Sequence, residues 1–307
     1  MNGNQDPSKD DLQAIQLPNY TNHVCDLCGS DDPIEIPYAR LYTGNQPIHV
    51  CGNCGFVYVQ SRRTSEEIAR VWSEEIYGDV YTAVKNPAMI ARQTFVSEFL
   101  ASQVDLVGKK LCDIGAGEGF SLKYLKDQYG ILPFGVEPSE KNCARLNEFN
   151  IPTYAGTIEE FLVGREGKAY QADVVTIMWT LENCLSCMDM LNGANQMLPV
   201  GGRVLVATGS RILVPFKKPL FMYLSGNPAD SHCFRFSANA LQTALAKAGF
   251  RTVETNRYLD SDILCILAEK VPESELIPPR TDHPVEVLSF FERWHHDSIH
   301  FLRDWTS

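Results

Sequence analysis

A glycine-rich turn after an apolar run constrains the fold more than any other feature of the sequence. The run at residues 111–114 contains Asp113, and glycines follow at the alternating positions 115, 117 and 119. The pattern predicts a β-strand that enters a tight turn and then a helix, because glycines let the backbone turn sharply and let a ligand approach it. The spacing D-x-G-x-G-x-G differs from the G-x-G-x-x-G of dinucleotide-binding proteins, in which a helix N-terminus binds pyrophosphate. The turn therefore favours a ligand that needs no phosphate contact.

Strand and helix patterns alternate from residue 110 to residue 270. Strands are expected at residues 110–114, 133–137, 152–154, 173–178, 202–208, 251–258 and 263–269. Helices are expected at residues 119–129, 139–149, 188–198 and 237–248. Repeated β/α units imply a doubly wound, mostly parallel sheet, here with seven strands. The last two strands should pair antiparallel at one edge, because no helix connects them.

Composition divides the chain into five segments. Residues 1–20 are polar and are expected to be a disordered tail. Residues 21–60 carry four cysteines, and residues 61–105 form a helical connector or lid over the strand ends, with one helix capped at residues 64–67. Residues 106–270 form the β/α domain, and residues 210–236 within it are a long insertion of the kind that is often functional. Residues 271–307 begin Pro-rich and end in an aromatic helix that packs on the domain or joins a homodimer.

The bulk properties restrict the partners. The chain has 307 residues and a formal net charge of −11 at pH 7, so phosphate backbones repel it and nucleic acid is a disfavoured partner. No apolar run approaches the ~20 residues of a membrane span. The N-terminus lacks the basic and apolar regions of a signal peptide, and ten cysteines without such a signal indicate a reducing compartment. A cytoplasmic protein with a small-molecule partner is expected.

Two cysteine pairs predict a metal site. Cys25 and Cys28 form one C-x-x-C knuckle, and Cys51 and Cys54 form a second, each followed by a glycine. Four thiolates suit tetrahedral zinc and leave no open position, so the site is expected to be a structural zinc ribbon. Zinc binding, at ~10–16 kcal/mol in small modules, would fold a segment too short for its own core. A third C-x-x-C at residues 184–187 has no second pair, and ordinary buried or half-buried thiols are expected there.

A second carboxylate makes the ligand predicted from the glycine turn more specific. Glu137 lies 24 residues after Asp113, at the end of the second expected strand, where open α/β sheets bind ligands. A carboxylate there can accept hydrogen bonds from both ribose hydroxyls of an adenosine, and bonds to a charged acceptor contribute roughly 1.5–3 kcal/mol. Either carboxylate alone is more often a surface or capping residue. Together, around this turn, they favour S-adenosylmethionine.

Residues 75–270 resemble class I S-adenosylmethionine-dependent methyltransferases in the segments 113–119, 136–139, 172–182 and 198–206. The resemblance implies that the glycine turn faces the methionine end of the cofactor, that Glu137 holds the ribose and that Thr157 flanks the adenine. It also places Met178 and Trp179 beside the sulfonium. The cofactor-binding residues that it implies are Asp113, Gly115, Ala116, Gly117, Glu137, Pro138, Thr157, Met178, Trp179 and Tyr81.

The arrangement of a cysteine-rich segment followed by this domain resembles that of bacterial methyltransferases of natural-product, sugar and surface-glycan pathways. That likeness implies a sugar, nucleotide-sugar or natural-product acceptor. Many relatives read L-E-H after the fourth strand, whereas this chain reads Leu181-Glu182-Asn183. A catalytic histidine is therefore absent at that position.

Acceptor-side residues are harder to assign. His232, at the end of the insertion, is a candidate base or substrate contact, and the alternative is a packing role at the start of the next helix. Tyr77 and Tyr81 could close over the cofactor, and core packing is equally compatible. Positively charged residues of the insertion are favoured to be solvated loop charges over contacts to an anionic substrate. These residues are Arg211, Lys217 and Lys218.

Two other functions stay open. Some ribosomal-RNA methyltransferases also carry an N-terminal zinc ribbon, but such a protein should present a basic face. A catalytically inactive protein could keep the fold and use the ribbon for interactions, although the intact glycine turn and Glu137 argue against it. The fold does not distinguish O-, N- and C-methylation.

Overall fold

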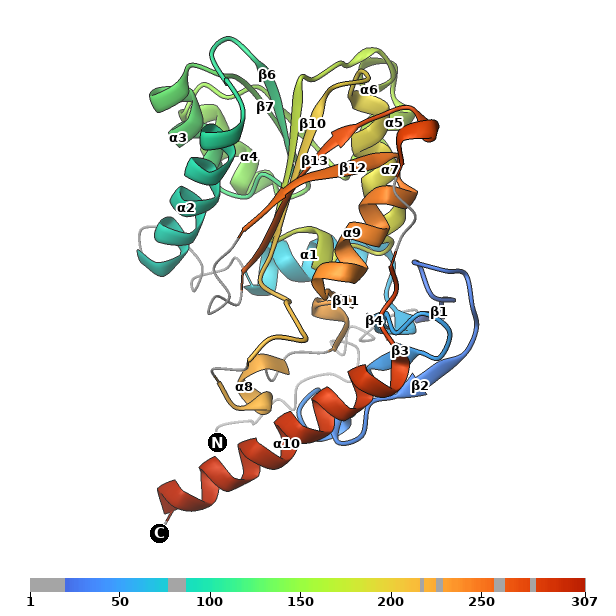
Figure 1. Cartoon of the computed structure of the whole chain (residues 1–307). Coiled ribbons are helices and arrows are strands. Elements are labelled where there is room, and N and C mark those ends of the chain that lie inside the picture. Colours follow the sequence, from blue (N-terminus) through green and yellow to red (C-terminus); the bar gives the residue numbers. More distant parts are fainter. Residues whose placement is uncertain are drawn as a thin grey trace, which may run out of the picture.

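The computed structural model describes residues 20–76, 87–215, 218–224, 229–256, 263–276 and 280–306. Residues 1–19, Tyr77, Tyr81 and Lys217 lie outside the described residues, so the predictions made for them are not addressed by the structure. A layered α/β body stands above a smaller β-rich region, and a long C-terminal helix runs beneath both in the view of Figure 1.

A seven-stranded sheet forms the middle layer of the α/β body, as predicted, with the strand order β12-β13-β10-β9-β6-β7-β8. The pairs from β8 to β10 are parallel, and only β13 runs against its neighbours β10 and β12. The expected antiparallel pairing of the last two strands is therefore confirmed. The strands are β6 (Lys110–Ile114), β7 (Leu132–Glu137), β8 (Thr153–Ala155), β9 (Val174–Met178), β10 (Arg203–Thr208), β12 (Phe250–Thr255) and β13 (Leu264–Lys270).

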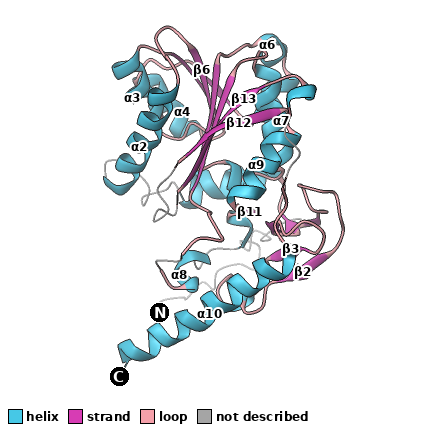
Figure 2. Cartoon of the chain, viewed as in Figure 1, coloured by secondary structure: helices cyan, strands magenta, loops and turns pink. Residues whose placement is uncertain are grey.

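Helices cover both faces of the sheet (Figure 2). One face carries α2 (Pro87–Gln103), α3 (Phe120–Tyr129) and α4 (Glu140–Glu148). The other face carries α5 (Ile158–Val163), α6 (Arg165–Ala169), α7 (Cys187–Met197) and α9 (Ala238–Lys247). All five residues of the central strand β9 are buried, as expected where helices cover both sides of a parallel sheet. The four predicted helices of the β/α domain are confirmed, whereas α5 and α6 had not been predicted.

The cysteine-rich region is built around a four-stranded sheet with the order β11-β4-β3-β2. Its strands are β2 (Pro33–Glu35), β3 (His49–Cys51), β4 (Val57–Tyr58) and β11 (Phe234–Arg235). Because β11 belongs to the 210–236 insertion, that insertion completes the sheet of a region more than 170 residues earlier in the chain. A separate pair is formed by β1 (Thr21–Asn22) and β5 (Ser61–Arg62).

The two sheets share one hydrophobic core. Cys25 and Phe56 of the cysteine-rich region belong to the same buried cluster as Phe236, Leu241 and Val206, the last of which lies on strand β10 of the large sheet. The cysteine-rich region therefore packs as part of the α/β body and contributes to its core.

Two short helices connect the cysteine-rich region to the sheet. Helix α1 (Ser65–Arg70) begins with the predicted capping box, in which Thr64 and Glu67 bond each other's backbone. A π-helical segment, η2 (Val71–Ile76), follows directly. Both lie beneath the sheet in Figure 1, near the ends of its strands.

The C-terminal helix α10 (Pro284–Thr306) packs on the cysteine-rich region and on α8 (Leu220–Leu224) of the insertion. Val287, Phe291 and Trp294 are buried in one cluster with residues of β3 and α8. Trp294 Nε1 also donates to the carbonyl oxygen of Lys218 at 2.8 Å. Among the described residues, no helix combines the length and apolar character that crossing a membrane requires.

Candidate active site and metal centre

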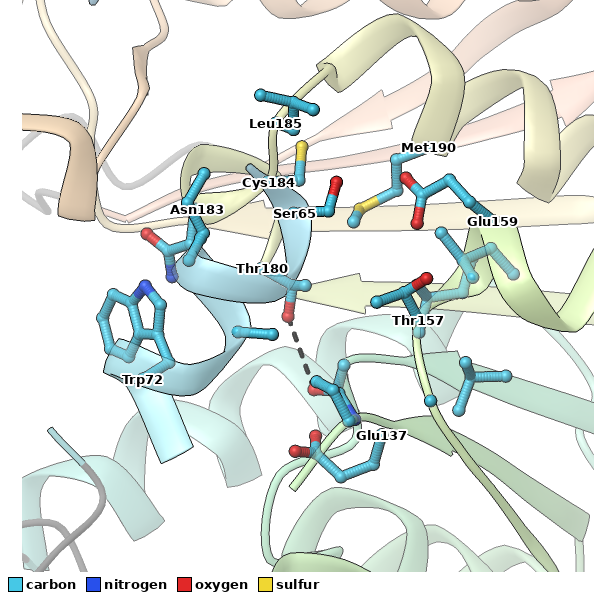
Figure 3. A pocket seen from close by; sticks show the side chains of 18 of the residues that line it. Ser65, Trp72, Glu137, Thr157, Glu159, Thr180, Asn183, Cys184, Leu185 and Met190 are labelled. Carbon is cyan, nitrogen blue, oxygen red and sulfur yellow. Dashed lines mark hydrogen bonds between the residues drawn. The ribbon is translucent and has the colours of Figure 1, made fainter. Parts of the chain in front are cut away.

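A pocket lies at the carboxyl ends of β6, β7, β8 and β9, where ligands bind in open α/β sheets (Figure 3). Its far wall comes from α1 and η2, which contribute Ser65, Ile68 and Trp72. The helical segment therefore covers the strand ends. The residues predicted to bind the cofactor that line this pocket are Gly115, Glu137, Pro138, Thr157 and Trp179.

The first turn of the pocket requires glycine. Gly115 has a φ of +73°, and its N–H donates to the carbonyl oxygen of Val136 at 2.8 Å, which holds the turn against β7. A Cβ at Gly115 would lie 2.4 Å from the side chain of Thr180. Both the left-handed backbone and the close approach of Thr180 exclude a larger residue.

Glu137 is held rigidly at the pocket wall. Its side chain is only 5% exposed. Its Oε2 accepts from the N–H of Gly117 at 2.8 Å, and its Oε1 accepts from the N–H of Ser139 at 2.9 Å. Burial raises the pKa of the carboxyl, and these backbone hydrogen bonds oppose the rise because they stabilise the charged form. The carboxylate therefore has a fixed position beside the glycine turn.

Asp113 lies behind the turn and does not line the pocket. It is buried, and its Oδ1 accepts from Thr176 Oγ1 on the neighbouring strand at 2.7 Å. Burial raises the pKa of Asp113 to about 7. Three other predicted residues, Ala116, Gly117 and Met178, also stand outside the pocket lining. The structure thus brings five of the predicted cofactor residues to the pocket and places four outside its lining.

Trp179 has a strained backbone at the end of β9. Its φ is +55°, which is uncommon for a bulky residue and costs of order 1–3 kcal/mol. Two hydrogen bonds hold it there: its N–H donates to Ala207 O, and Asn183 Nδ2 donates to Trp179 O, each at 2.7 Å. Strain that is maintained beside a pocket indicates a functional constraint on this turn.

Trp72 is a pocket residue that the sequence analysis did not name, and Asn183 was named there only as the residue at the position of the absent histidine. Asn183 Oδ1 is buried and has no hydrogen-bond partner among the described residues. Its place, just after the fourth parallel strand, is the signal that could have found it, because strand carboxyl ends carry the ligand site. Trp72 had no such signal, since only tertiary packing brings η2 over the sheet.

His232 lies next to the pocket wall, in contact with Trp72. It does not line the cavity, but its ring stacks on that of Trp72 with 5.6 Å between centroids. Burial lowers the pKa of His232 to about 4, and the positive charges of Arg235 and Lys218 act in the same direction. The imidazole is therefore neutral near pH 7, and its Nδ1 finds no hydrogen-bond partner in the described part of the chain.

The four predicted cysteines come together in one cluster. The distance from Cys25 Sγ to Cys54 Sγ is 3.6 Å, and Cys28 Sγ to Cys51 Sγ is 3.5 Å. All four sulfur atoms lie within 4.8 Å of one another. A tetrahedral zinc ion with Zn–S bonds of about 2.3 Å would separate its thiolates by about 3.8 Å. The cluster is therefore compatible with a structural zinc ion.

The glycine that follows each C-x-x-C knuckle allows its loop to close. Gly29 and Gly55 have φ values of +73° and +70°. Their N–H groups donate to Cys25 O at 2.7 Å and to Cys51 O at 2.9 Å, which closes the two loops. The pair at residues 184–187 has no comparable partner: among the described residues, only the cluster of residues 25, 28, 51 and 54 groups three or more metal-ligating side chains in this way.

Comparison with known proteins identifies the class. A family model described as a methyltransferase domain matches residues 90–255, which is more than half of the chain. The chain belongs to this methyltransferase family. Its fold and family make it an S-adenosylmethionine-dependent methyltransferase. No curated protein matches the sequence.

Solved structures show the same fold at low sequence identity. A methyltransferase from Haloferax volcanii, solved with the Trm112 methyltransferase activator, is 14% identical with a TM-score of 0.52, over 66% of this chain and 97% of its own. An S-adenosylmethionine-dependent methyltransferase from Thermotoga maritima is 19% identical with a TM-score of 0.50, over 66% of this chain and 99% of its own. An O-methyltransferase family protein from Burkholderia thailandensis is 14% identical with a TM-score of 0.50, over 67% of this chain and 66% of its own.

Proposed function

We propose that the enzyme methylates a small-molecule acceptor: a sugar, a nucleotide-sugar or a natural-product intermediate. The observation that carries the cofactor assignment is the buried carboxylate of Glu137, fixed by two backbone N–H groups at the wall of the pocket. In this proposal residues 21–60 form the zinc ribbon, residues 61–105 the connector and lid, residues 106–270 the catalytic domain and residues 271–307 a C-terminal extension. The cysteine usage favours a cytoplasmic location.

The cofactor site follows from the residues around the pocket. Glu137 accepts hydrogen bonds from the ribose hydroxyls, and Pro138 and Thr157 flank the base. The turn at Gly115 approaches the methionine end, with Asp113 behind it as the nearest fixed carboxyl. S-adenosylmethionine, when bound, supplies a methyl group activated on a sulfonium.

The chain's own contribution to the reaction is orientation of the acceptor. Holding a nucleophile in line can contribute roughly 7–11 kcal/mol to the rate. Trp72, Trp179 and Asn183 also line the pocket and form the proposed acceptor wall. Asn183 Oδ1, which has no partner among the described residues, is placed to accept a hydrogen bond from an acceptor hydroxyl or amine.

His232 is proposed as a residue that supports the acceptor wall through Trp72, and not as the catalytic base. A general base works best when its pKa lies near the operating pH, whereas burial lowers the pKa of His232 to about 4. Its neutral imidazole can instead accept a hydrogen bond at Nδ1 and support Trp72 by stacking.

The proposed zinc ion has a structural role. Cys25, Cys28, Cys51 and Cys54 supply four thiolates, which fill a tetrahedral shell and leave no position for substrate. The ion therefore stabilises the cysteine-rich sheet and takes no part in the chemistry.

Calorimetry with S-adenosylmethionine tests the cofactor assignment. The zinc-loaded full chain should bind the cofactor, and Glu137→Ala should weaken binding by roughly tenfold to a hundredfold, as expected for lost bonds to a charged acceptor. The exposed Glu140, three residues later, provides the control, and Glu140→Ala should bind like the wild type. Absence of binding by the folded wild-type protein would contradict the proposed activity.

The acceptor class needs a separate assay. Transfer of a labelled methyl group can be followed with a panel of sugars, nucleotide-sugars and natural-product intermediates, and with total RNA. The net charge of −11 favours a small acceptor over RNA. Labelling of RNA alone would replace the small-molecule proposal by the RNA alternative.

A further inference from the structure

Glu182 is a buried acid in the turn that follows the central strand of the large sheet. It belongs to η3 (Leu181–Asn183), directly after β9, and is 2% exposed. No ion pair of the described residues includes it. Burial raises its pKa to about 7, and the Thr208 hydroxyl and the Gly209 N–H oppose the rise. A buried carboxyl is costly without partners, so its few contacts indicate what it is for.

The carboxyl of Glu182 joins the end of β9 to the end of β10. Its Oε1 accepts from the N–H of Gly209 at 3.0 Å. Gly209 is the first residue after β10, and the ladder between β10 and β13 ends one residue earlier, at Thr208. A buried backbone donor needs a partner. Glu182 therefore bonds an N–H that strand pairing does not reach.

Gly209 in turn supports the indole of Trp179. A Cβ at Gly209 would lie 3.4 Å from both Cδ1 and Nε1 of that ring, and apart from its chain neighbours no other described atom would come within 4 Å. The ring therefore packs over the bare Cα of Gly209. Trp179 N–H also donates to Ala207 O at 2.7 Å. Backbone and ring of Trp179 thus both rest on residues 207–209.

These contacts close a circuit around a strained turn. Trp179 has a φ of +55°, and Asn183 Nδ2 donates to its carbonyl oxygen at 2.7 Å. The next link is the packing of the indole on Gly209, and Glu182 completes the circuit by bonding Gly209. A strained backbone persists only where the surrounding structure over-determines it. Glu182 supplies the one side-chain bond that fixes the residue beneath the ring.

We propose that Glu182 is a positioning residue for methyl transfer, which fixes the indole of Trp179 against the pocket through the backbone of Gly209. Trp179 lines the pocket and Glu182 does not, so Glu182 acts through its neighbours and not on the substrate. This inference rests on the proposed function, in which Trp179 belongs to the acceptor wall. Without the bond, Gly209 is free to move from the ring and the turn relaxes, so the wall loses its fixed shape.

Fluorine NMR of the full, zinc-loaded chain labelled with fluorotryptophan tests the proposal. The chain has four tryptophans, and Trp179→Phe and Trp294→Phe assign the two resonances that are needed. Glu182→Met keeps the length of the side chain but removes the acceptor oxygen, and it should move the Trp179 resonance by more than its linewidth. Trp294 is buried in a separate cluster with α10, so its resonance is the internal control and should stay in place.

Two further variants test the two links of the circuit separately. Glu182→Gln keeps an oxygen that accepts from the N–H of Gly209, so it should leave the Trp179 resonance at the wild-type position. Gly209→Ala keeps the bond to Glu182 but adds a Cβ at 3.4 Å from the ring, and it should move the same resonance. Gly209 is not among the residues with positive φ, so the alanine adds no left-handed strain.

Transfer kinetics separate positioning from general stability. With the acceptor found by the labelling assay, Glu182→Met should lower kcat by about tenfold, the size of one lost hydrogen bond. Its affinity for S-adenosylhomocysteine should change by less than about twofold, because Glu137 and Gly115 keep their own hydrogen bonds. Glu182→Gln should keep both values.

The outcomes are distinguishable. A Trp179 resonance that stays in place in Glu182→Met overturns the proposal, and so does an equal shift in Glu182→Gln or at Trp294. A moved resonance with unchanged kcat overturns the role in transfer. If Glu182→Met does not fold, Glu182→Asp decides by the same criteria, because its carboxyl is one methylene shorter. The spectra are recorded without cofactor, so absence of S-adenosylmethionine binding by the wild type refutes the proposed function and leaves the dependence of Trp179 on Glu182 measurable.

Discussion

Arg62 and Asp26 form a buried ion pair, with 2.6 Å between Nη2 and Oδ2. Asp26 belongs to the first cysteine knuckle. Arg62 Nη1 also donates to the carbonyl oxygen of Leu185, which lines the pocket, and its guanidinium lies 4.8 Å from the ring centre of Phe234. One side chain thus connects the metal centre, the insertion and the pocket wall.

Removal of Arg62 should destabilise the protein strongly. Arg62→Met leaves the carboxylate of Asp26 buried without its partner, a change that costs about 3–5 kcal/mol in comparable buried pairs. The free energy of unfolding in guanidinium chloride measures it. The double variant Arg62→Met with Asp26→Asn should recover part of the loss. Arg40→Met, which breaks an exposed pair with Glu35, is the control and should change stability little. Equal losses in Arg62→Met and Arg40→Met would contradict this account.

Metal removal should weaken cofactor binding although the metal lies outside the pocket. Cys25 and Cys54 belong to the same buried cluster as residues of the main sheet, so loss of the cysteine-rich fold disturbs the wall that Leu185 forms. Calorimetry before and after chelation should show lower affinity for S-adenosylhomocysteine, restored by zinc. In metal analysis, Cys187→Ala should keep one zinc per chain, whereas Cys51→Ala should lose it. Unchanged cofactor affinity in metal-free protein would refute the coupling.

Gly115→Ala should cost more stability than backbone strain alone explains. Gly115 and Gly201 both have positive φ, +73° and +86°, but a Cβ at Gly201 meets nothing within 4 Å. Gly201→Ala therefore isolates the left-handed backbone cost, about 1–2 kcal/mol. Gly115→Ala adds the clash with Thr180, and the double variant with Thr180→Ala should recover part of that excess, because the Cβ that remains at residue 180 still lies 2.9 Å from the added Cβ. Chemical denaturation measures all four proteins, and equal losses at the two glycines would show that Thr180 imposes no constraint.

Buried carboxyls should make the ligand-free protein less stable as the pH rises. Burial raises the pKa of Asp113 and of Glu182 to about 7 each. Between about pH 4 and 7 these groups are protonated when folded and ionised when unfolded, so unfolding releases protons and stability falls with rising pH. Each group contributes up to about 1.4 kcal/mol per pH unit.

Two isosteric variants measure this dependence. Asp113→Asn and Glu182→Gln should each flatten the fall in unfolding free energy between about pH 5 and 7, relative to the wild type. The comparison with the wild type at every pH cancels the pH dependence of metal binding, which all the proteins share. A slope that neither variant changes would show that these carboxyls are not the source.

Much of the fold could be predicted because its signals are local. The strand at residues 110–114 was predicted with its observed bounds, and the caps at Thr64 and Ser139 mark helices that form as expected. Such signals depend on neighbours three or four residues away. Helices α5 and α6 were missed because each is short, at six and five residues, and offers little periodicity to detect.

The candidate site was predictable only in part. Gly115, Glu137 and Trp179 lie at strand ends or directly after them, and the strand pattern in the sequence is enough to identify the ligand edge of a parallel sheet. Whether such a residue faces the cavity depends on its side-chain direction, and Asp113 points toward β9 instead. Trp72 reaches the pocket from a helix that local sequence does not place over the sheet.

The sequence by itself determined the class of fold, the glycine turn and the two cysteine knuckles, because residue type and close spacing specify each of them. Only the tertiary structure decided that β11 completes the cysteine-rich sheet, that Arg62 joins this sheet to the pocket wall, and that Glu182 joins the end of β9 to that of β10. It also buries Arg211, for which the expectation of a solvated loop charge is wrong. Burial and charge pairing arise from contacts between segments far apart in the chain. A local pattern in the sequence does not encode those contacts.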